Sequence, residues 1–282
     1  MTIEMGEYVM ERKSIPHYRI GDYARNMGVT PDLLKHYERK GLIQSVQAEN
    51  GYRYYPFNQS VPLLECMRLR NYGVTLHEMD NLLNSADVSQ VRATLDHHAA
   101  RMKSRVFRDT LFLEEHEKLT RWLSRMENAP FWEILFREPM LFLPHSNGFE
   151  FLDSPDIQTL LPEWMSWMPL VKSARLSRWM ESGDATGQWG FVIAEETAEG
   201  IRLPVNKAVI RIPGGRYLQY SAHLTFQNAK PAKDSFLAIR DVFQRLDVPI
   251  PDEFLQIVIM NLRIRNCQES FSIFRLRMPD NP

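Results

Sequence analysis

Basic and phenolic side chains concentrate in one stretch near the N-terminus of this sequence. Lys35, His36 and Arg39 are the outward polar members of one short segment, and Arg53 and Tyr54 follow soon after it. Ammonium, imidazole, guanidinium and phenol groups donate hydrogen bonds to phosphate oxygens and to base edges. The predicted chemistry of this stretch is therefore recognition of a nucleic acid.

The overall charge gives this prediction no support. The chain carries a formal net charge of −1, and residues 15–80 hold eight lysines and arginines against seven aspartates and glutamates. Any surface that binds nucleic acid must therefore be a local patch rather than the product of a global field. The composition, 44% hydrophobic and 24% charged, is typical of a globular protein.

The elements predicted to position these groups form a helix-turn-helix. Apolar residues from Ile20 to Met27 share one helical face, and Gly28 ends that helix. Thr30 is a good N-cap for a second helix that starts at Pro31 and ends near Gly41. In this geometry the second helix presents its N-terminal and outward residues to the major groove of DNA. On these two helices alone, a solvated surface helix is an equally favoured interpretation.

The next segment is predicted to be a wing, a short hairpin beside the recognition helix. Gln44–Gln47 and Tyr52–Tyr55 flank an Asn50-Gly51 turn. Arg53 supplies a phosphate contact, and tyrosine hydroxyls donate to phosphate oxygens. A third helix over about Gln59–Tyr72 and a fourth, opened by a capping box at Thr75-Leu76-His77-Glu78, complete the block.

This series resembles the MerR family of regulators in residue types, order and spacing. The matching residues are Tyr18-Arg19-Ile20-Gly21, Gly28-Val29-Thr30, Tyr37-Glu38, Gly41-Leu42, Asn50-Gly51-Tyr52-Arg53-Tyr54-Tyr55, Leu69-Arg70, Gly73, Leu76 and Glu78. The resemblance implies a homodimer that binds double-stranded, palindromic promoter DNA and works with RNA polymerase. The residues assigned to DNA are Arg19, Thr30, Lys35, His36, Arg39, Arg53, Tyr54 and Arg70. Lys35 departs from the arginine common in the family, which makes a bidentate contact there less favourable.

The predicted architecture is a multidomain chain, α followed by α+β. A winged helix-turn-helix covers residues 15–84, a long dimerisation helix covers 87–128, and an effector domain covers 129–282. The family resemblance implies an antiparallel coiled coil for the long helix. Its seam residues are Leu95, Ala99, Met102, Val106, Leu119, Leu123 and Met126. A long helix packed within its own chain remains the alternative.

The last block resembles, more weakly, the GyrI-like effector domain of the multidrug-sensing MerR regulators. Five predicted strands cover Gly187–Glu195, Asn206–Pro213, Arg216–His223, Phe254–Leu262 and Ser270–Met278, with a helix over Lys233–Leu246. The resemblance implies a pocket for a small, flat organic ligand. Candidate ligand contacts are Trp164, Trp167, Trp189, Tyr220, Gln256, Glu269 and Phe271. Gln256 takes the place of a glutamate that is buried in drug-binding relatives, which weakens the expected preference for cations.

Two cysteines far apart in sequence predict neither a disulfide framework nor the cysteine clusters of metal and redox sensors. We therefore expect no metal, no cofactor, no membrane segment and a cytoplasmic, non-enzymatic protein. Two alternatives stay open at this point. Some GyrI-like domains are hydrolases, and the chain is otherwise compatible with an architectural DNA-binding protein that has no ligand.

Overall fold

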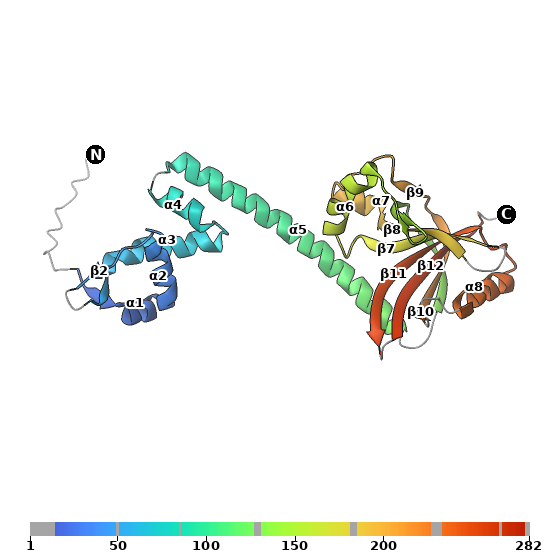
Figure 1. Ribbon diagram of the computed structural model, residues 1–282, viewed down its shortest axis with the longest axis horizontal. Helices are drawn as coiled ribbons and strands as arrows, with labels where there is room; N and C mark the ends of the chain where they lie inside the picture. Colours follow the sequence, from blue (N-terminus) through green and yellow to red (C-terminus); the bar gives the residue numbers. More distant parts are fainter. Residues whose placement is uncertain are drawn as a thin grey trace, which may run out of the picture. The chain divides into compact units, whose positions relative to one another are not determined.

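The computed structural model describes residues 15–48, 51–84, 86–126, 131–180, 185–226, 233–264 and 267–279. The chain divides into two compact units, Met1–Arg108 and Asp109–Pro282, and the long helix α5 (Val88–Met126) runs across the boundary (Figure 1). Asn50, predicted at the tip of the wing, lies outside the described residues.

The N-terminal unit contains the predicted series of short helices. They are α1 (Ile20–Met27), α2 (Pro31–Arg39), the 3-10 turn η1 (Phe57–Gln59), α3 (Ser60–Asn71) and α4 (Leu76–Asn84). Gly28 ends α1 with a φ of 67°, a left-handed conformation that costs glycine little. The Thr30 hydroxyl accepts a hydrogen bond from the Leu33 amide at 3.2 Å, which caps α2. The predicted helix-turn-helix is confirmed, because α1 ends at Gly28 and α2 begins at the Thr30 cap, as the sequence predicted.

The wing is a three-stranded sheet rather than a simple hairpin. Its order is β1–β3–β2, formed by His17–Arg19, Arg53–Pro56 and Val46–Gln47. The two predicted strands are present, and β1 is an addition that three residues of sequence could not reveal. This extra strand fixes Arg19 directly opposite Tyr54.

The core of this unit lies between the helices and the sheet. Leu34, Tyr37, Tyr55 and Cys66 are almost fully buried, and the ring of Tyr55 stacks on Tyr23 at 5.3 Å between centroids. Burying an apolar side chain of this size stabilises the fold by about 1.5–3 kcal/mol. The recognition helix α2 is thus anchored through its inward face, which leaves its outward residues in solvent.

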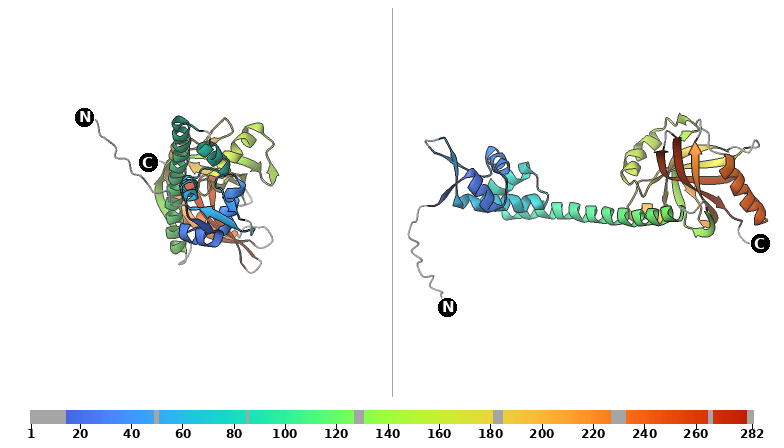
Figure 2. Two further views of the ribbon diagram at one scale, coloured as in Figure 1. Left: turned by 90° about the vertical axis from the view of Figure 1, so that its left-hand side faces the viewer. Right: turned by 90° about the horizontal axis from the view of Figure 1, so that it is seen from below.

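Within the described residues, the C-terminal unit is built on one nine-stranded antiparallel sheet. The order is β4–β10–β12–β11–β7–β8–β5–β6, and β9 pairs with β5. The strands are β4 (Phe131–Arg137), β5 (Met140–Asn147), β6 (Glu150–Phe151), β7 (Lys172–Trp179), β8 (Ala185–Ala194), β9 (Ile210–Ile212), β10 (Gly215–Phe226), β11 (Glu253–Ile264) and β12 (Cys267–Arg277). The helices are α6 (Pro155–Ser166), α7 (Glu195–Gly200) and α8 (Lys233–Arg245), and Figure 2 shows α8 beside the sheet from a second side.

The two faces of this sheet have different coverings. Leu218 and Phe274 pack against Ile239 and Phe243 of α8. Ile273, the neighbour of Phe274, instead belongs to a cluster with Leu255 and with Trp122 of α5. Because successive side chains of a strand point to opposite faces, α8 covers one face and the last turns of α5 cover the other.

Candidate functional site

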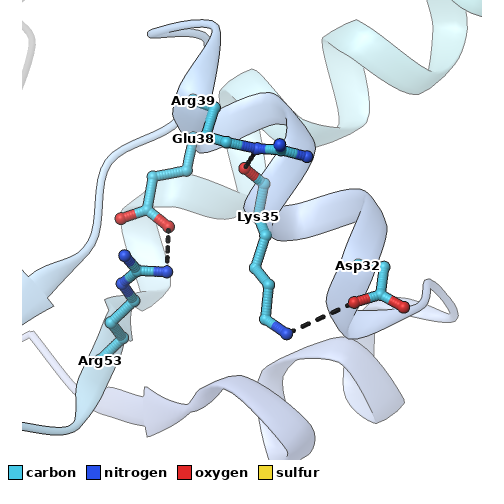
Figure 3. A pocket seen from close by; sticks show the side chains of 5 residues that line it. All are labelled: Asp32, Lys35, Glu38, Arg39 and Arg53. Carbon is cyan, nitrogen blue, oxygen red and sulfur yellow. Dashed lines mark hydrogen bonds and ion pairs between the residues drawn. The ribbon is translucent and has the colours of Figure 1, made fainter.

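The outward face of α2 carries two of the predicted groove contacts, held by local bonds. Lys35 forms an exposed ion pair with Asp32, at 3.3 Å between Nζ and Oδ1. The Nε of Arg39 donates to the Lys35 carbonyl oxygen at 3.3 Å (Figure 3). An exposed pair of this kind contributes only about 0–1 kcal/mol. Both cations can therefore exchange these partners for phosphate or base atoms at small cost.

Glu38 ties the recognition helix to the wing. Its carboxylate accepts hydrogen bonds from the Tyr55 hydroxyl at 2.9 Å and from the Ser45 hydroxyl, and Nη1 of Arg53 lies 3.7 Å from Oε2. Burial and the nearby carboxylate both raise the pKa of Tyr55, so its hydroxyl stays a donor. Tyr37-Glu38 belongs to the matched sequence motif, but its part in fixing the wing was not predicted.

These residues surround an open hollow of about 590 Å³, lined by Asp32, Lys35, Glu38, Arg39 and Arg53 (Figure 3). The hollow brings together three of the predicted DNA contacts, two from α2 and one from β3. A second group forms on the wing sheet. There the Arg19 guanidinium lies 5.4 Å from the centroid of the Tyr52 ring, and hydrogen bonding to Tyr54 raises the pKa of Arg19.

The other predicted DNA contacts lie outside the hollow. Thr30 is exposed and caps α2. His36 is half-buried, with its ring 6.4 Å from that of Tyr37. Arg70 is exposed on the last turn of α3. Their part in DNA binding stays a prediction.

A second candidate site is a pocket of about 570 Å³ in the C-terminal unit. It lies on the sheet face covered by the last turns of α5, and 18 residues from six segments of this unit line it. They are Glu115, His116, Lys118, Leu119, Trp122, Arg137, Met168, Pro169, Val171, Lys172, Ser173, Gln219, Val258, Ile259, Met260, Asn261, Ile273 and Arg275. Its size falls in the range of small-molecule sites, about 300–1,000 Å³.

Two arginines dominate the polar part of this pocket, Arg137 of β4 and Arg275 of β12, on the two strands that flank β10. Nη2 of Arg137 donates to Oε1 of Gln219 at 2.8 Å, and Nε of Arg275 donates to the same oxygen at 3.3 Å. Burial lowers the pKa of Arg275 to about 10, with the Arg137 charge contributing in the same direction. Arginine side chains are cationic at neutral pH, so the pocket holds two like charges that share one oxygen acceptor.

The apolar wall of the pocket is fixed by contacts of its own. The indole Nε1 of Trp122 donates to the Ser221 hydroxyl at 3.0 Å. The same indole meets Phe271 edge-on, at 6.4 Å between centroids and 85° between planes. Neither Trp122 nor the two arginines were predicted as ligand contacts. The signal of the two arginines, polar residues alternating with apolar ones along a strand, is shared by every exposed strand.

Four of the predicted ligand contacts are core residues. Trp164 is fully buried and donates to the Pro204 carbonyl oxygen at 2.9 Å, and Trp167 donates to Glu163 at 3.0 Å. Tyr220 packs in the cluster beneath α8. Gln256 is buried and donates to the Ser272 hydroxyl at 3.1 Å. None of them lines the pocket described above.

The other three predicted contacts lie closer to solvent. Trp189 is half-buried, 5.8 Å from the Arg175 guanidinium. Glu269 pairs with His223 at 2.8 Å, and the ring of Phe271 stacks on His223 at 4.3 Å. Of all seven predicted contacts, Phe271 has the closest link to the pocket, through its contact with Trp122. Ligand binding by the seven stays a prediction.

The described residues contain no group of three or more His, Cys, Asp or Glu side chains that could hold a metal ion. Cys66 is a core residue, and burial raises the pKa of its thiol to about 11. Over the same part of the chain, no helix has the length and apolar character needed to span a bilayer.

The N-terminal unit matches a known protein family. The family described as "MerR HTH family regulatory protein" matches residues 18–86. The HTH-type transcriptional regulator CueR of Escherichia coli is 31% identical over 98 residues, which cover 34% of this chain and 68% of CueR.

Two further matches extend into the C-terminal unit. The transcriptional regulator BrlR of Pseudomonas aeruginosa is 22% identical over 231 residues, 78% of this chain and 83% of BrlR. A solved structure of an EcmrR–DNA complex covers 93% of this chain and 100% of its own, with 14% identity and a TM-score of 0.35. The family match and the identity to CueR, taken with the helix-turn-helix, show that the chain belongs to the MerR family of DNA-binding transcription regulators.

Proposed function

We propose that this regulator is ligand-responsive. It binds a palindromic promoter as a homodimer, and it changes the geometry of the DNA when a small organic molecule occupies the pocket of its C-terminal unit. The observation that carries the proposal is that α5 contributes side chains to both units. Leu95 of this helix packs against the core of the N-terminal unit, whereas Leu119 and Trp122 line the pocket of the C-terminal unit. One continuous helix thus belongs to both the DNA-reading unit and the candidate ligand site.

The proposed DNA contacts follow the two groups of basic residues. Lys35, His36 and Arg39 of α2 reach base edges in the major groove. The contacts to phosphates are assigned to Arg19, Arg53, Tyr54 and Arg70, with Thr30 at the start of α2. The exposure of Lys35, Arg39 and Arg53 around one hollow supports this assignment.

The proposed homodimer forms through α5. Met102, Val106 and Leu113 follow heptad-like spacing and are 40%, 65% and 64% exposed. Phe107, next to them, is 49% exposed. Apolar side chains of this size gain about 25 cal/mol for each Å² removed from water. A second copy of the helix is the proposed cover, and a two-fold dimer matches a palindromic site.

The proposed mechanism is regulation by DNA deformation, with RNA polymerase as the partner that reads the result. Bending a promoter site costs about 1–6 kcal/mol, depending on angle and sequence. A ligand can shift the dimer toward the bending state only by its difference in affinity for the two states. A pocket that α5 helps to form supports such a difference, because any movement of α5 against the sheet changes the pocket lining.

Footprinting of the dimer on its own promoter, paired with transcription by RNA polymerase, tests this function. We expect protection of a palindromic site, and a ligand-dependent hypersensitive cleavage at its centre that accompanies a change in transcript level. An unchanged footprint and transcript level across aromatic ligands of every charge would leave a DNA-binding protein without a sensor function. In a parallel reaction, the double variant Lys35→Ala/Arg39→Ala should lose protection.

A further inference from the structure

We infer that the pocket of the C-terminal unit takes an amphipathic anion, in which a flat apolar body carries a carboxylate or phosphate group held by Arg137 and Arg275. This inference rests on the proposed function, because it names the chemical class of the molecule that the regulator senses. It departs from the cationic ligands expected from the GyrI-like resemblance.

The first observation is the charge of the lining. Four cationic side chains line the pocket, Lys118, Arg137, Lys172 and Arg275, against one carboxylate, Glu115. Glu115 is already engaged, since its Oε1 pairs with Nζ of Lys172 and its Oε2 lies 3.7 Å from Nζ of Lys118. The two arginines are thus the charges left for a ligand.

The second observation is the incomplete set of acceptors around these arginines. Both guanidiniums donate to the single Oε1 of Gln219, Nη1 of Arg275 donates to the weak acceptor Sδ of Met140 at 2.7 Å, and the buried Nε of Arg137 has no acceptor. Among the described residues, no carboxylate oxygen lies within 4.0 Å of either group. Glu133, which acts on Arg137 from farther away, pairs with Arg125 at 3.1 Å. Arginines held like this present ready donors for a carboxylate or phosphate, and an anion would also offset the repulsion between them.

The third observation is the apolar wall next to the cations. Trp122, Val258 and Ile259 line the same pocket, and the hydrogen bond from the indole to Ser221 holds the ring in place. A preformed aromatic surface favours a flat ring system. The combination therefore selects a molecule with one apolar end and one anionic end.

A cation would have the opposite balance. It would enter a partly buried site beside two arginines, with no unpaired carboxylate in the lining to receive it. Burying a charge without a partner is costly, and like charges add to that cost. By the same argument, an uncharged analogue should bind with intermediate affinity. It contacts the apolar wall but gives the arginine donors no charged acceptor.

Isothermal titration calorimetry of the full chain with four naphthyl probes tests this inference. The probes are 2-naphthoate, 1-naphthyl phosphate, 2-naphthamide and 2-naphthylmethylammonium. We expect at least one anion to bind about tenfold or more tightly than the amide, and the ammonium to bind most weakly of all. The relative affinity of naphthoate and naphthyl phosphate distinguishes a carboxylate ligand from a phosphate ester.

Variants localise the effect to the two arginines. Arg275→Gln and Arg137→Gln should each weaken binding of the anion about tenfold to a hundredfold, the range that a charge-assisted hydrogen bond supports, and leave the amide unchanged. Arg275→Lys should keep part of the affinity. Arg245→Gln, which removes an exposed cation from α8, is the matched control. Because Arg275 is repelled by Arg137, we expect its replacement by glutamine to leave the thermal unfolding of the C-terminal unit intact.

Equal or tighter binding of the ammonium, failure of both anions to bind, or full affinity in both arginine variants would overturn the inference. The same probes added to the promoter footprint separate it from the proposed function. If the ammonium binds and changes transcription, the charge assignment fails and the sensor stands. If an anion binds in the calorimeter without changing footprint or transcript, the pocket assignment stands and the sensor function fails.

Discussion

A single carboxylate, that of Glu38, joins the recognition helix to the wing through three partners on other segments. Glu38→Ala leaves the buried Tyr55 hydroxyl without its acceptor. We expect a loss of about 1–3 kcal/mol in the stability of the N-terminal unit, the cost of a buried unsatisfied polar group. Tyr55→Phe removes only one hydrogen bond, worth about 1 kcal/mol. In the double variant the Tyr55 hydroxyl is absent, so its loss of an acceptor no longer contributes and the combined loss should be smaller than the sum.

Urea unfolding followed by far-UV circular dichroism measures this double-mutant cycle. All six tryptophans lie at or beyond residue 122, so tryptophan fluorescence follows the C-terminal unit alone and should be unchanged by these substitutions. Strict additivity of the two losses would show that Glu38 and Tyr55 act independently. A weaker promoter affinity of Glu38→Ala at low denaturant would link the same contact to the placement of Arg53.

The residues around the hollow at α2 were easier to predict from the sequence than the residues of the C-terminal pocket. Lys35, Arg39 and Arg53 were predicted from sequence because the short local elements that carry them, a capped helix and a hairpin, fix their placement. Arg137 and Arg275 face the pocket only through the register of β4, β10 and β12, which pairs residues far apart in sequence. The tryptophans were predicted as ligand contacts because they are large aromatic residues. Trp164 instead lies in the core, where a large aromatic side chain buries the most apolar area.

At the scale of elements, helix α4 starts with the capping box that its sequence predicts. The Thr75 amide donates to Glu78 at 2.7 Å, and the Glu78 amide donates to the Thr75 hydroxyl at 3.4 Å. Glu78→Ala should lower the stability of the N-terminal unit by about 1 kcal/mol, the usual value of a helix cap. Asp80→Ala, one exposed carboxylate of the same helix, is the control for charge alone.

The effect of Glu78 should depend on pH in a definite direction. Hydrogen bonds from Thr75 hold the pKa of Glu78 below its ordinary value of 4.5. A carboxyl whose pKa is lower in the folded state stabilises that state above its unfolded pKa, and this contribution disappears as the pH falls through the folded pKa. The stability difference between the parent and Glu78→Ala should therefore be constant at neutral pH and shrink below about 4.5. A difference that persists undiminished to pH 3 would rule out the carboxylate as the stabilising group.

Elements were predictable where local signals agreed and were missed where they conflicted. The helix α8 and five strands of the sheet were predicted within a few residues. The strand β5 was missed because Pro144 lies inside it, and proline argues against an inner strand. The structure accommodates Pro144 at a register shift in the pairing with β8, between Pro144 and Ser146. β7 was missed because its arginines and serines dilute the apolar alternation of Ala174 and Leu176.

At the scale of the whole molecule, the seam predicted along α5 is only partly available to a second chain. Leu95 packs on the N-terminal core, Leu119 lines the pocket, and Met126 is buried in the C-terminal unit. A heptad pattern cannot tell a helix that packs on its own chain from one that packs on a copy, because both bury the same face. In the middle of the helix, Met102, Val106, Phe107 and Leu113 remain exposed, whereas Leu111 and Phe112 pack on the core of the C-terminal unit.

This middle segment gives the proposed homodimer a direct test. Leu113→Glu or Val106→Glu places a charge among the exposed apolar residues of α5, and burying an unpaired carboxylate in an interface is strongly unfavourable. We expect either variant to sediment as a monomer at micromolar concentration and to lose protection of a palindromic site, while the tryptophan fluorescence of its C-terminal unit stays unchanged. Ser104→Glu adds the same charge to another exposed side of the helix and should remain dimeric.

Dimers that persist in both apolar-face variants would place the interface outside this segment. Monomers that still protect both half-sites would separate DNA binding from dimerisation. Loss of the dimer together with loss of the footprint is the result that joins α5 and the two half-sites in one mechanism.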